Sequence, residues 1–327
     1  MTARTRRAPL VTALAAASVL ALGACSSSGQ IEAAAAAEQG AGTGTALTVD
    51  TSPQQERIRT TESPEAVGLL PPGLVDDGVL RVATSPFSAP LAFYADDNAT
   101  AIGHETDIAQ LVADGLGLEL ELVPTDWAGW PLATQSGEVD VTISNVTVTE
   151  ERKQLFDFSS YRVDELGFLA KAGSQLRVEG PADVAGLTIA VGSGTNQEEI
   201  LLAWDEQNRA AGLDPVDVQY FENDGDTTLA LQSGRLDLSF GPNATAAYKA
   251  AVSPADFTVV GTVNGGWPRT AQIAVATAKG NGLAPAVTAA LNAAIDDGSY
   301  PQVLERWGLT SESVERSETN PPGLPAT

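Results

Sequence analysis

Several residue types that often carry protein chemistry are almost missing from this chain. Its 327 residues include one cysteine, one histidine and one methionine. A single cysteine excludes an intrachain disulfide, and the chain offers no cluster of His and Cys ligands for a metal ion. We therefore expect no metal site and no cofactor.

Basic residues are scarce as well. The chain has 18 Lys and Arg against 42 Asp and Glu, for a formal net charge of −24. Nucleic acids and anionic lipids also carry negative charge, so the composition argues against both as partners. The hydrophobic fraction of 43% is nevertheless enough to build a large core. The composition indicates an acidic globular protein, which we expect to be a monomer.

The N-terminal apolar run is too short for a transmembrane helix. Arg4, Arg6 and Arg7 precede a mostly apolar run over residues 8–22, whereas a membrane span needs about 20 apolar residues. A basic start followed by such a run is typical of a secretory signal peptide. We expect residues 1–24 to direct export and to be removed.

The single cysteine, Cys25, lies directly after this run. The segment Leu22–Cys25 resembles the lipobox of bacterial lipoproteins, in which small residues fit a peptidase and the thiol then takes a lipid. The alternative is a buried thiol, but a Ser- and Gly-containing stretch follows. The next residues, up to about 75, are rich in Ala, Gly, Ser, Thr and Gln, which predicts a flexible tether. We expect residues 25–75 to anchor an exported protein to the outer face of the membrane.

Short β-type runs and amphipathic helical segments alternate from Gly78 onward, a pattern typical of an α/β fold with mostly parallel strands. A first half has predicted strands at 79–84, 118–122 and 139–148, with helices at 108–116 and 130–135. A second half has strands at 187–191, 216–221 and 236–240, with helices at 197–210, 227–232 and 244–251.

The two halves share a local pattern. In Gln135–Ile143 and again in Gln232–Phe240, a helix reaches a glycine and an apolar strand follows. The glycine can take the left-handed conformation that ends a helix. Similar halves predict two lobes with a cleft between them, although this junction also recurs in unrelated α/β proteins.

The rest of the chain has no partner half, and we expect it to return and complete the first lobe. Residues after 312 are polar and rich in Pro, which predicts disorder. The predicted boundaries are 76–171 and 267–312 for lobe 1, 172–266 for lobe 2, and 313–327 for a disordered tail.

Two segments carry a resemblance to a known family. Gly103–Ala109 is similar to the signature that opens the first helix, and Asp140–Arg152, with Phe156–Ser159 after it, is a closer match. Over roughly residues 79–309 the chain resembles the solute-binding proteins of polar amino acid ABC importers, called family 3. The resemblance implies a two-lobed, periplasmic-binding-protein-like (type II) fold whose ligand lies between lobes joined by two hinges, near Ala170 and Trp267.

The resemblance also implies ligand-binding residues. Arg152 occupies the place of the arginine that forks onto the ligand's α-carboxylate, and a planar guanidinium can donate two parallel hydrogen bonds to a carboxylate. The alternative is a surface arginine at a helix start, where a cation opposes the helix dipole. The other residues implied are Ser144, Asn145, Thr147 and Trp127 on lobe 1, and Thr195 and Asn196, with Gly194 in the turn before them, on lobe 2. Asn145 could instead be a turn residue. Two further candidates are Phe87, as a second apolar wall or a packing residue, and Asn243 on lobe 2.

One position departs from the family. The aspartate that pairs with the ligand's α-ammonium in many relatives falls at Pro242, which has neither a charge nor an N–H donor. Asn243 and Ser85 are weaker substitutes. Either another acid and carbonyl groups hold the amine, or the ligand is a modified carboxylate.

The resemblance therefore implies the binding component of an ABC importer, which captures a small carboxylate-bearing, amino-acid-like solute and passes it to a membrane permease. Two alternatives stay open. The first is an enzyme on the same fold, similar to the periplasmic cyclohexadienyl dehydratases, but the only histidine, His104, stands at a position more typical of packing than of acid–base catalysis. The second is a sensor coupled to a membrane receptor.

Overall fold

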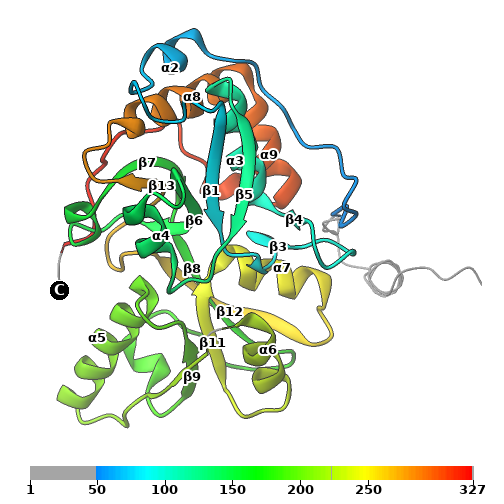
Figure 1. Cartoon of the computed structure of the whole chain (residues 1–327). Coiled ribbons are helices and arrows are strands. Elements are labelled where there is room, and N and C mark those ends of the chain that lie inside the picture. The colour runs from blue at the N-terminus through cyan, green and yellow to red at the C-terminus, as the bar shows by residue number, and fades with distance from the viewer. Residues whose placement is uncertain (1–48, 222, 326–327) are drawn as a thin grey trace, which may run out of the picture.

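The computed structural model describes residues 49–221 and 223–325, so the predicted signal peptide and Cys25 lie outside the described residues. The described chain forms two lobes, each built on a five-stranded sheet (Figure 1). In each sheet one strand runs against the other four, which confirms the two-lobed α/β fold with mostly parallel sheets. Over the same residues, no helix combines the length and apolar character that a membrane span requires.

Lobe 1 has the strand order β5-β1-β6-β13-β7. Successive residues of β13 face opposite sides of the sheet: Ile273 and Val275 pack with α3 and α8, whereas Ala274 and Ala276 pack with Trp130 of α4. Helices therefore cover both faces, as expected for a sheet of this kind. The elements are β1 (Val79–Thr84), α3 (His104–Gly115), β5 (Glu119–Pro124), α4 (Trp130–Ser136), β6 (Val141–Thr147), β7 (Phe156–Val163), β13 (Gln272–Ala278), α8 (Leu283–Asp297) and α9 (Ser299–Trp307).

Lobe 2 has the order β10-β9-β11-β8-β12 and repeats this layering. Phe168 of β8 stacks on Trp204 of α5, whereas its neighbour Leu169 packs on the opposite face with Leu231 of α6 and Ala246 of α7. Helix α5 therefore lies on one face of the sheet, and α6 and α7 lie on the other (Figure 1). The elements are β8 (Glu165–Lys171), β9 (Thr188–Val191), α5 (Asn196–Ala210), β10 (Asp217–Tyr220), α6 (Asp224–Gln232), β11 (Leu238–Pro242), α7 (Asn243–Val252) and β12 (Phe257–Asn264).

Shorter elements complete the chain. A small antiparallel sheet follows β1, close to α7 in Figure 1. These elements are α2 (Pro64–Gly68), β2 (Phe87–Ser88), β3 (Ala92–Tyr94), β4 (Ala101–Ile102) and the 3-10 turns η1 (Arg152–Gln154), η2 (Pro181–Val184) and η3 (Thr310–Glu312).

The pattern shared by the two halves is confirmed in three dimensions. Gly137 and Gly234 both have positive φ, 75° and 74°, at the end of α4 and just after α6. Three residues after each glycine, an aspartate accepts a backbone N–H from the adjacent parallel strand: Asp140 from Arg81 of β1 and Asp237 from Thr188 of β9, both at 2.8 Å. The two glycine-to-strand junctions therefore make the same backbone contact.

The first hinge is not where the sequence predicted it. Strands β7 and β8 belong to different lobes, and the chain crosses at Asp164 rather than near Ala170, so residues 165–171 belong to lobe 2. Apolar residues continue on both sides of Asp164 and each strand is buried in its own core, so the sequence does not mark this boundary. The second crossing joins β12 to β13 through residues 265–271 and contains Trp267, as predicted.

Part of the predicted tether is also structured. Residues 49–75 pack along lobe 1, where Val49 and Ile58 contact its core. Arg57 donates hydrogen bonds to the carbonyl oxygens of Thr106 and Ala101, at 2.8 and 2.9 Å. The composition of this segment is that of a tether, but the pattern Arg57-Ile58-Arg59 alternates polar and apolar side chains, and an alternating segment can bury one side.

The prediction of a disordered tail is wrong for residues 313–325. The amide of Asn320 donates to the carbonyl of Phe158 at 2.8 Å, and Ser160 donates to the carbonyl of Glu318 at 3.1 Å. These bonds fall on β7, an edge strand with unpaired backbone groups. A polar segment with Pro and Gly can occupy such an edge without a core of its own. We call residues 317–325 the C-terminal strap.

Candidate functional site

A cavity of about 410 Å³ lies between the lobes. It is large enough for a small metabolite. Five residues that the sequence assigned to ligand binding line it: Phe87, Trp127, Ser144 and Asn145 from lobe 1, and Thr195 from lobe 2. Their role in binding stays a prediction, but the fold brings them to one cavity from four separate segments, since Ser144 and Asn145 both belong to β6.

Arg152 is not among the residues that line this cavity, but it lies beside the lining residue Trp127 and connects the two lobes there. It begins η1, where its backbone amide donates to Thr149 Oγ1 at 3.0 Å. Its Nη1 donates to the carbonyl of Thr147 in lobe 1 at 2.8 Å, and its Nη2 donates to the carbonyl of Gly194 in lobe 2 at 3.1 Å. The guanidinium carbon also lies 5.6 Å from the centre of the Trp127 ring, a cation–π distance. Burial lowers the pKa of Arg152 from its usual value, and the group stays charged.

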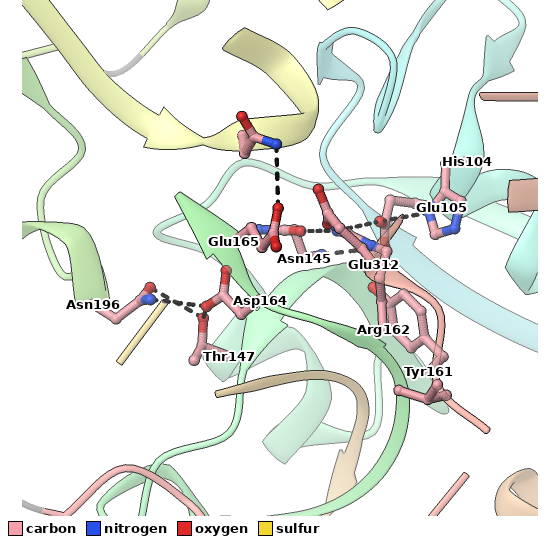
Figure 2. A network of polar contacts seen from close by, with 12 residues as sticks. His104, Glu105, Asn145, Thr147, Tyr161, Arg162, Asp164, Glu165, Asn196 and Glu312 are labelled. Carbon is pink, nitrogen blue, oxygen red and sulfur yellow. Dashed lines mark hydrogen bonds and ion pairs between the residues drawn. The ribbon is translucent and has the colours of Figure 1, made fainter. Parts of the chain in front are cut away.

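Thr147 and Asn196 do not line this cavity. Thr147 Oγ1 donates to Asn196 Oδ1 at 3.0 Å and lies 2.8 Å from Asp164 Oδ2 (Figure 2). The Asn196 amide donates to the same Asp164 oxygen at 2.9 Å and to the carbonyl of Gly265 at 2.6 Å. Two residues predicted to touch the ligand therefore meet at the hinge. We call Thr147, Asp164, Asn196 and Gly265 the hinge cluster.

Asp164 is the centre of this cluster, and sequence reasoning missed it. Its side chain is 1% exposed, and burial raises the pKa of its carboxyl. Its backbone carbonyl accepts from Gly265 at 2.8 Å. A Cβ on Gly265 would lie 2.1 Å from the Asp164 Cγ, so the two chain crossings can approach this closely only with glycine at 265.

A second buried network lies below the cavity, and the sequence again gave no sign of it. Arg162 and Glu312 form an ion pair, each side chain 1% exposed. Arg162 also donates to Asn145 Oδ1 and lies 3.6 Å from the carboxylate of Glu105, which lines the cavity (Figure 2). The network thus connects the cavity wall to η3. Arg162 and Glu312 are 150 residues apart in the sequence, so no local sequence motif predicts their contact.

Glu105 has four polar neighbours of its own. It accepts a hydrogen bond from the Tyr161 hydroxyl and, at 3.2 Å, from the Asn145 amide, and its other oxygen lies 3.1 Å from His104 Nδ1. Burial alone opposes ionisation, but His104 and Arg162 outweigh it and hold the pKa of Glu105 below its usual value. Burial also lowers the pKa of His104. The expectation that His104 faces packing agrees with its complete burial.

Asn145 supports this wall through an unusual backbone. Its φ is 54°, in the left-handed region that Asn tolerates better than most residues. The turn lets its amide face Glu105 while its side chain accepts from Arg162. Asn145 therefore does more than form a turn, since it connects Glu105 to Arg162.

Gly194 and Thr195 form the start of α5. Gly194 has φ 70°, and Thr195 is the N-cap, accepting the Glu198 amide at 3.2 Å. The amide of Gly194 donates to the Glu198 carboxylate at 2.6 Å. This helix start therefore already holds a carboxylate, as the free N–H groups of a helix N-terminus allow.

The remaining predicted residues lie on the lobe 2 side or at the mouth of the cavity. Phe87 is 48% exposed and packs edge to face with Tyr94, 6.2 Å between ring centres. Asn243 does not line the cavity, and its amide is 3.5 Å from Glu165. Pro242 does line it, without a charge.

Across residues 49–221 and 223–325, no three His, Cys, Asp or Glu side chains converge as metal ligands would.

Comparisons with known proteins agree with this geometry. The sequence pattern described as bacterial extracellular solute-binding proteins, family 3, matches residues 80–310. The L-cystine-binding protein TcyJ of Escherichia coli (strain K12) is 35% identical over 161 residues, which cover 49% of this chain and 57% of TcyJ. The arginine-binding protein ArgT of Corynebacterium glutamicum is 27% identical over 81% of this chain and 86% of ArgT.

Among solved structures, an ancestral arginine-binding protein bound to arginine matches with a TM-score of 0.62 and 30% identity. This match covers 70% of the present chain and 98% of the other. The likeness extends over both lobes, whereas the match to TcyJ spans little more than half of that relative.

Proposed function

The chain belongs to the bacterial extracellular solute-binding proteins of family 3, and from this we propose that it is the exported binding component of an ABC importer. It captures a small, amino-acid-like solute bearing a carboxylate and delivers it, as a monomer, to a membrane permease. The relatives named for cystine and arginine support an amino-acid ligand.

The observation that carries this proposal is the position of Arg152 between the lobes. A guanidinium has five N–H donors, and the contacts with Thr147 and Gly194 use two of them. A carboxylate arriving over Trp127 can take two parallel bonds from the others, and such charge-assisted bonds are stronger than neutral ones. Because Gly194 belongs to lobe 2, Arg152 would both bind the ligand and stabilise the closed position of the two lobes.

An ammonium group would face acidic side chains of lobe 1. Glu105 and Asp126 both line the cavity. Because Glu105 is already engaged by Tyr161 and Asn145, Asp126 is the acid that we assign to the amine in place of one at Pro242. Ligand binding favours closure only through contacts that the open state lacks. A contact between the ligand and Thr195, which lines the cavity from lobe 2, would be of this kind.

The proposal assigns binding rather than catalysis. General acid–base chemistry needs a group that can reach the substrate, and the chain's one histidine is completely buried. Glu105 lines the cavity but is already engaged by Tyr161 and Asn145. These features favour a binding site that orders a solute without transforming it.

The test of binding is a thermal-shift and calorimetry screen of the full chain carrying Cys25→Ser, stripped of solute by unfolding and refolding. A ligand specific for the native state stabilises it, by about 2.7 kcal/mol at a concentration 100 times its Kd. We expect stabilisation by amino acids with a free α-carboxylate and none by their amides. Arg152→Ala should weaken binding by about 2–5 kcal/mol, the cost of removing one partner of a desolvated charged pair. The matched control is Arg209→Ala, an exposed arginine of α5.

The location is tested separately. If Cys25 carries a lipid, the native chain sediments with membranes, and Cys25→Ser releases it into the soluble fraction. If the native chain and Cys25→Ser divide equally between the membrane and soluble fractions, the lipid anchor is wrong. The proposed binding site would be unaffected by that result.

A further inference from the structure

The ligand cavity continues into a second, smaller chamber inside lobe 2. This chamber has a volume of about 110 Å³. It shares wall residues with the main cavity, so the two spaces adjoin. The shared residues are Ser88, Phe221, Asp224, Thr227 and Pro242. Pro242, where the family resemblance led us to expect an acid, forms part of this common wall.

The combined space runs across the edge of the lobe 2 sheet. At one end the main cavity is lined by Thr195 and Gln197, at the start of α5. At the other end it is lined by Asn223, Asp224 and Thr227, at the start of α6. Helices α5 and α6 lie on opposite faces of that sheet (Figure 1). Arg152 does not line either space, but its bond to Gly194 places it next to Thr195, at the α5 end of the main cavity.

An ion pair lies at the opposite end. Lys249 of α7 donates to Asp224 Oδ1 at 2.5 Å and to Thr228 Oγ1 at 2.8 Å. The side chains are 14% and 29% exposed, and both residues line the small chamber. Lys249 uses two of its three donors in these bonds, and the second carboxylate oxygen of Asp224 keeps its lone pairs for another donor.

The two lobes also meet at this end. Ser88 of lobe 1 and Thr245 of lobe 2 lie 3.0 Å apart through their hydroxyl oxygens, and both line the chamber. The ion pair is thus inside the region that lobe closure encloses, together with hydroxyl groups that can donate or accept.

We infer that the solute has two amino-acid heads, joined by a short linker, and that Asp224 and Lys249 bind the second head. This inference rests on the proposed function, in which Arg152 binds the first. A zwitterionic head matches an ion pair, because its ammonium can meet Asp224 while its carboxylate meets Lys249. A side chain ending in a cation alone would approach Lys249, and an apolar end would desolvate the pair without replacing its hydrogen bonds. Trp127, Phe87 and Phe221 provide the apolar walls along the linker.

Three probes of similar length test the assignment by titration calorimetry on the full chain with Cys25→Ser. L-cystathionine has two heads, L-arginine has one head and a distal cation, and S-propyl-L-cysteine has one head and an apolar end. We expect cystathionine to bind at least tenfold more tightly than the other two. Equal or tighter binding of arginine or S-propylcysteine would overturn the inference.

Variants at the ion pair give the second readout. Asp224→Asn and Lys249→Met should each weaken cystathionine at least tenfold and change the one-headed probes by less than threefold. Asp224→Asn preserves the size of the side chain, so it keeps the test valid if Lys249→Met does not fold. Lys171→Met, outside both cavities, is the control. Unchanged cystathionine affinity in Asp224→Asn would overturn the inference.

Failure of this inference differs from failure of the proposed function. If one-headed amino acids bind as tightly as cystathionine and lose affinity in Arg152→Ala, the importer function stands and the second head is wrong. If no probe binds the protein more tightly than it binds the Arg152→Ala variant, both the proposed function and this inference are wrong.

Discussion

Thr147 donates its hydroxyl to the amide oxygen of Asn196 at 3.0 Å, and this bond joins lobe 1 to lobe 2 directly beside the hinge. Both residues were expected to touch the ligand. In the structure they are 1% and 5% exposed and contact Asp164 instead. They therefore influence binding through the relative position of the lobes.

Thr147→Val tests this role, because valine has nearly the same shape and no hydroxyl. It leaves the amide oxygen of Asn196 with one partner fewer in a buried site, a loss that costs about 1–3 kcal/mol. We expect this decrease in the free energy of urea unfolding without any ligand. Thr262→Val, at an exposed position of β12, is the control. Unchanged stability of the ligand-free protein would favour direct ligand contact.

Asp164 predicts a pH dependence. Burial raises its pKa in the folded protein, so its contribution to stability is complete below the ordinary pKa of an aspartate and is lost as the pH rises through the raised value. Asp164→Asn removes the titrating group. The variant should therefore gain stability relative to the wild type as the pH rises from about 4 to 8.

Urea unfolding across that pH range measures the effect of Asp164→Asn. Glu206→Gln, an exposed residue of α5, is the control and should give a constant difference. A constant difference for Asp164→Asn as well would mean that Asp164 ionises as easily in the folded as in the unfolded chain.

The buried pair of Arg162 and Glu312 predicts a strong stability effect. Removing one partner leaves an uncompensated buried charge, which costs about 3–5 kcal/mol. We expect this loss for Arg162→Met and for Glu312→Gln, and a positive coupling energy in the double-mutant cycle. The exposed pair of Arg316 and Asp296, with side chains 56% and 66% exposed, should cost less than about 1 kcal/mol when broken. If the two pairs lose similar amounts of unfolding free energy when broken, burial does not make the pair of Arg162 and Glu312 more important for stability.

The C-terminal strap predicts an effect on affinity. Leu324 pairs with residues 148–150, since its amide donates to Val148 at 3.0 Å and its carbonyl accepts from Glu150 at 2.7 Å. This segment leads directly to Arg152. A stop codon after residue 316 should weaken ligand binding about tenfold in calorimetry, whereas a stop after residue 325 should have no effect. Full affinity in the shorter chain would show that the strap does not position Arg152.

The fold was predictable where local patterns carry it. The strand predicted at 79–84 agrees with β1, and the glycine junctions at 137 and 234 are confirmed with their left-handed backbones. The hinge at Asp164 was not predictable in this way. Apolar residues occur on both sides of it, and only the pairing of the two flanking strands with different sheets separates them.

The site was predictable only in part for a similar reason. Trp127, Ser144 and Thr195 lie on segments with a family pattern, and all three line the cavity. Asp224 and Lys249 are 25 residues apart and lie on different helices, so no local pattern connects them. Contacts between helices depend on how the layers pack, which a single sequence does not display.

The strap has one more consequence. A sheet edge with free N–H and C=O groups is a template on which another copy can add a strand. On lobe 1 the segment around Glu318 and Asn320 already occupies that side of β7. The strap therefore takes the backbone positions on β7 to which a strand from another copy would otherwise bond.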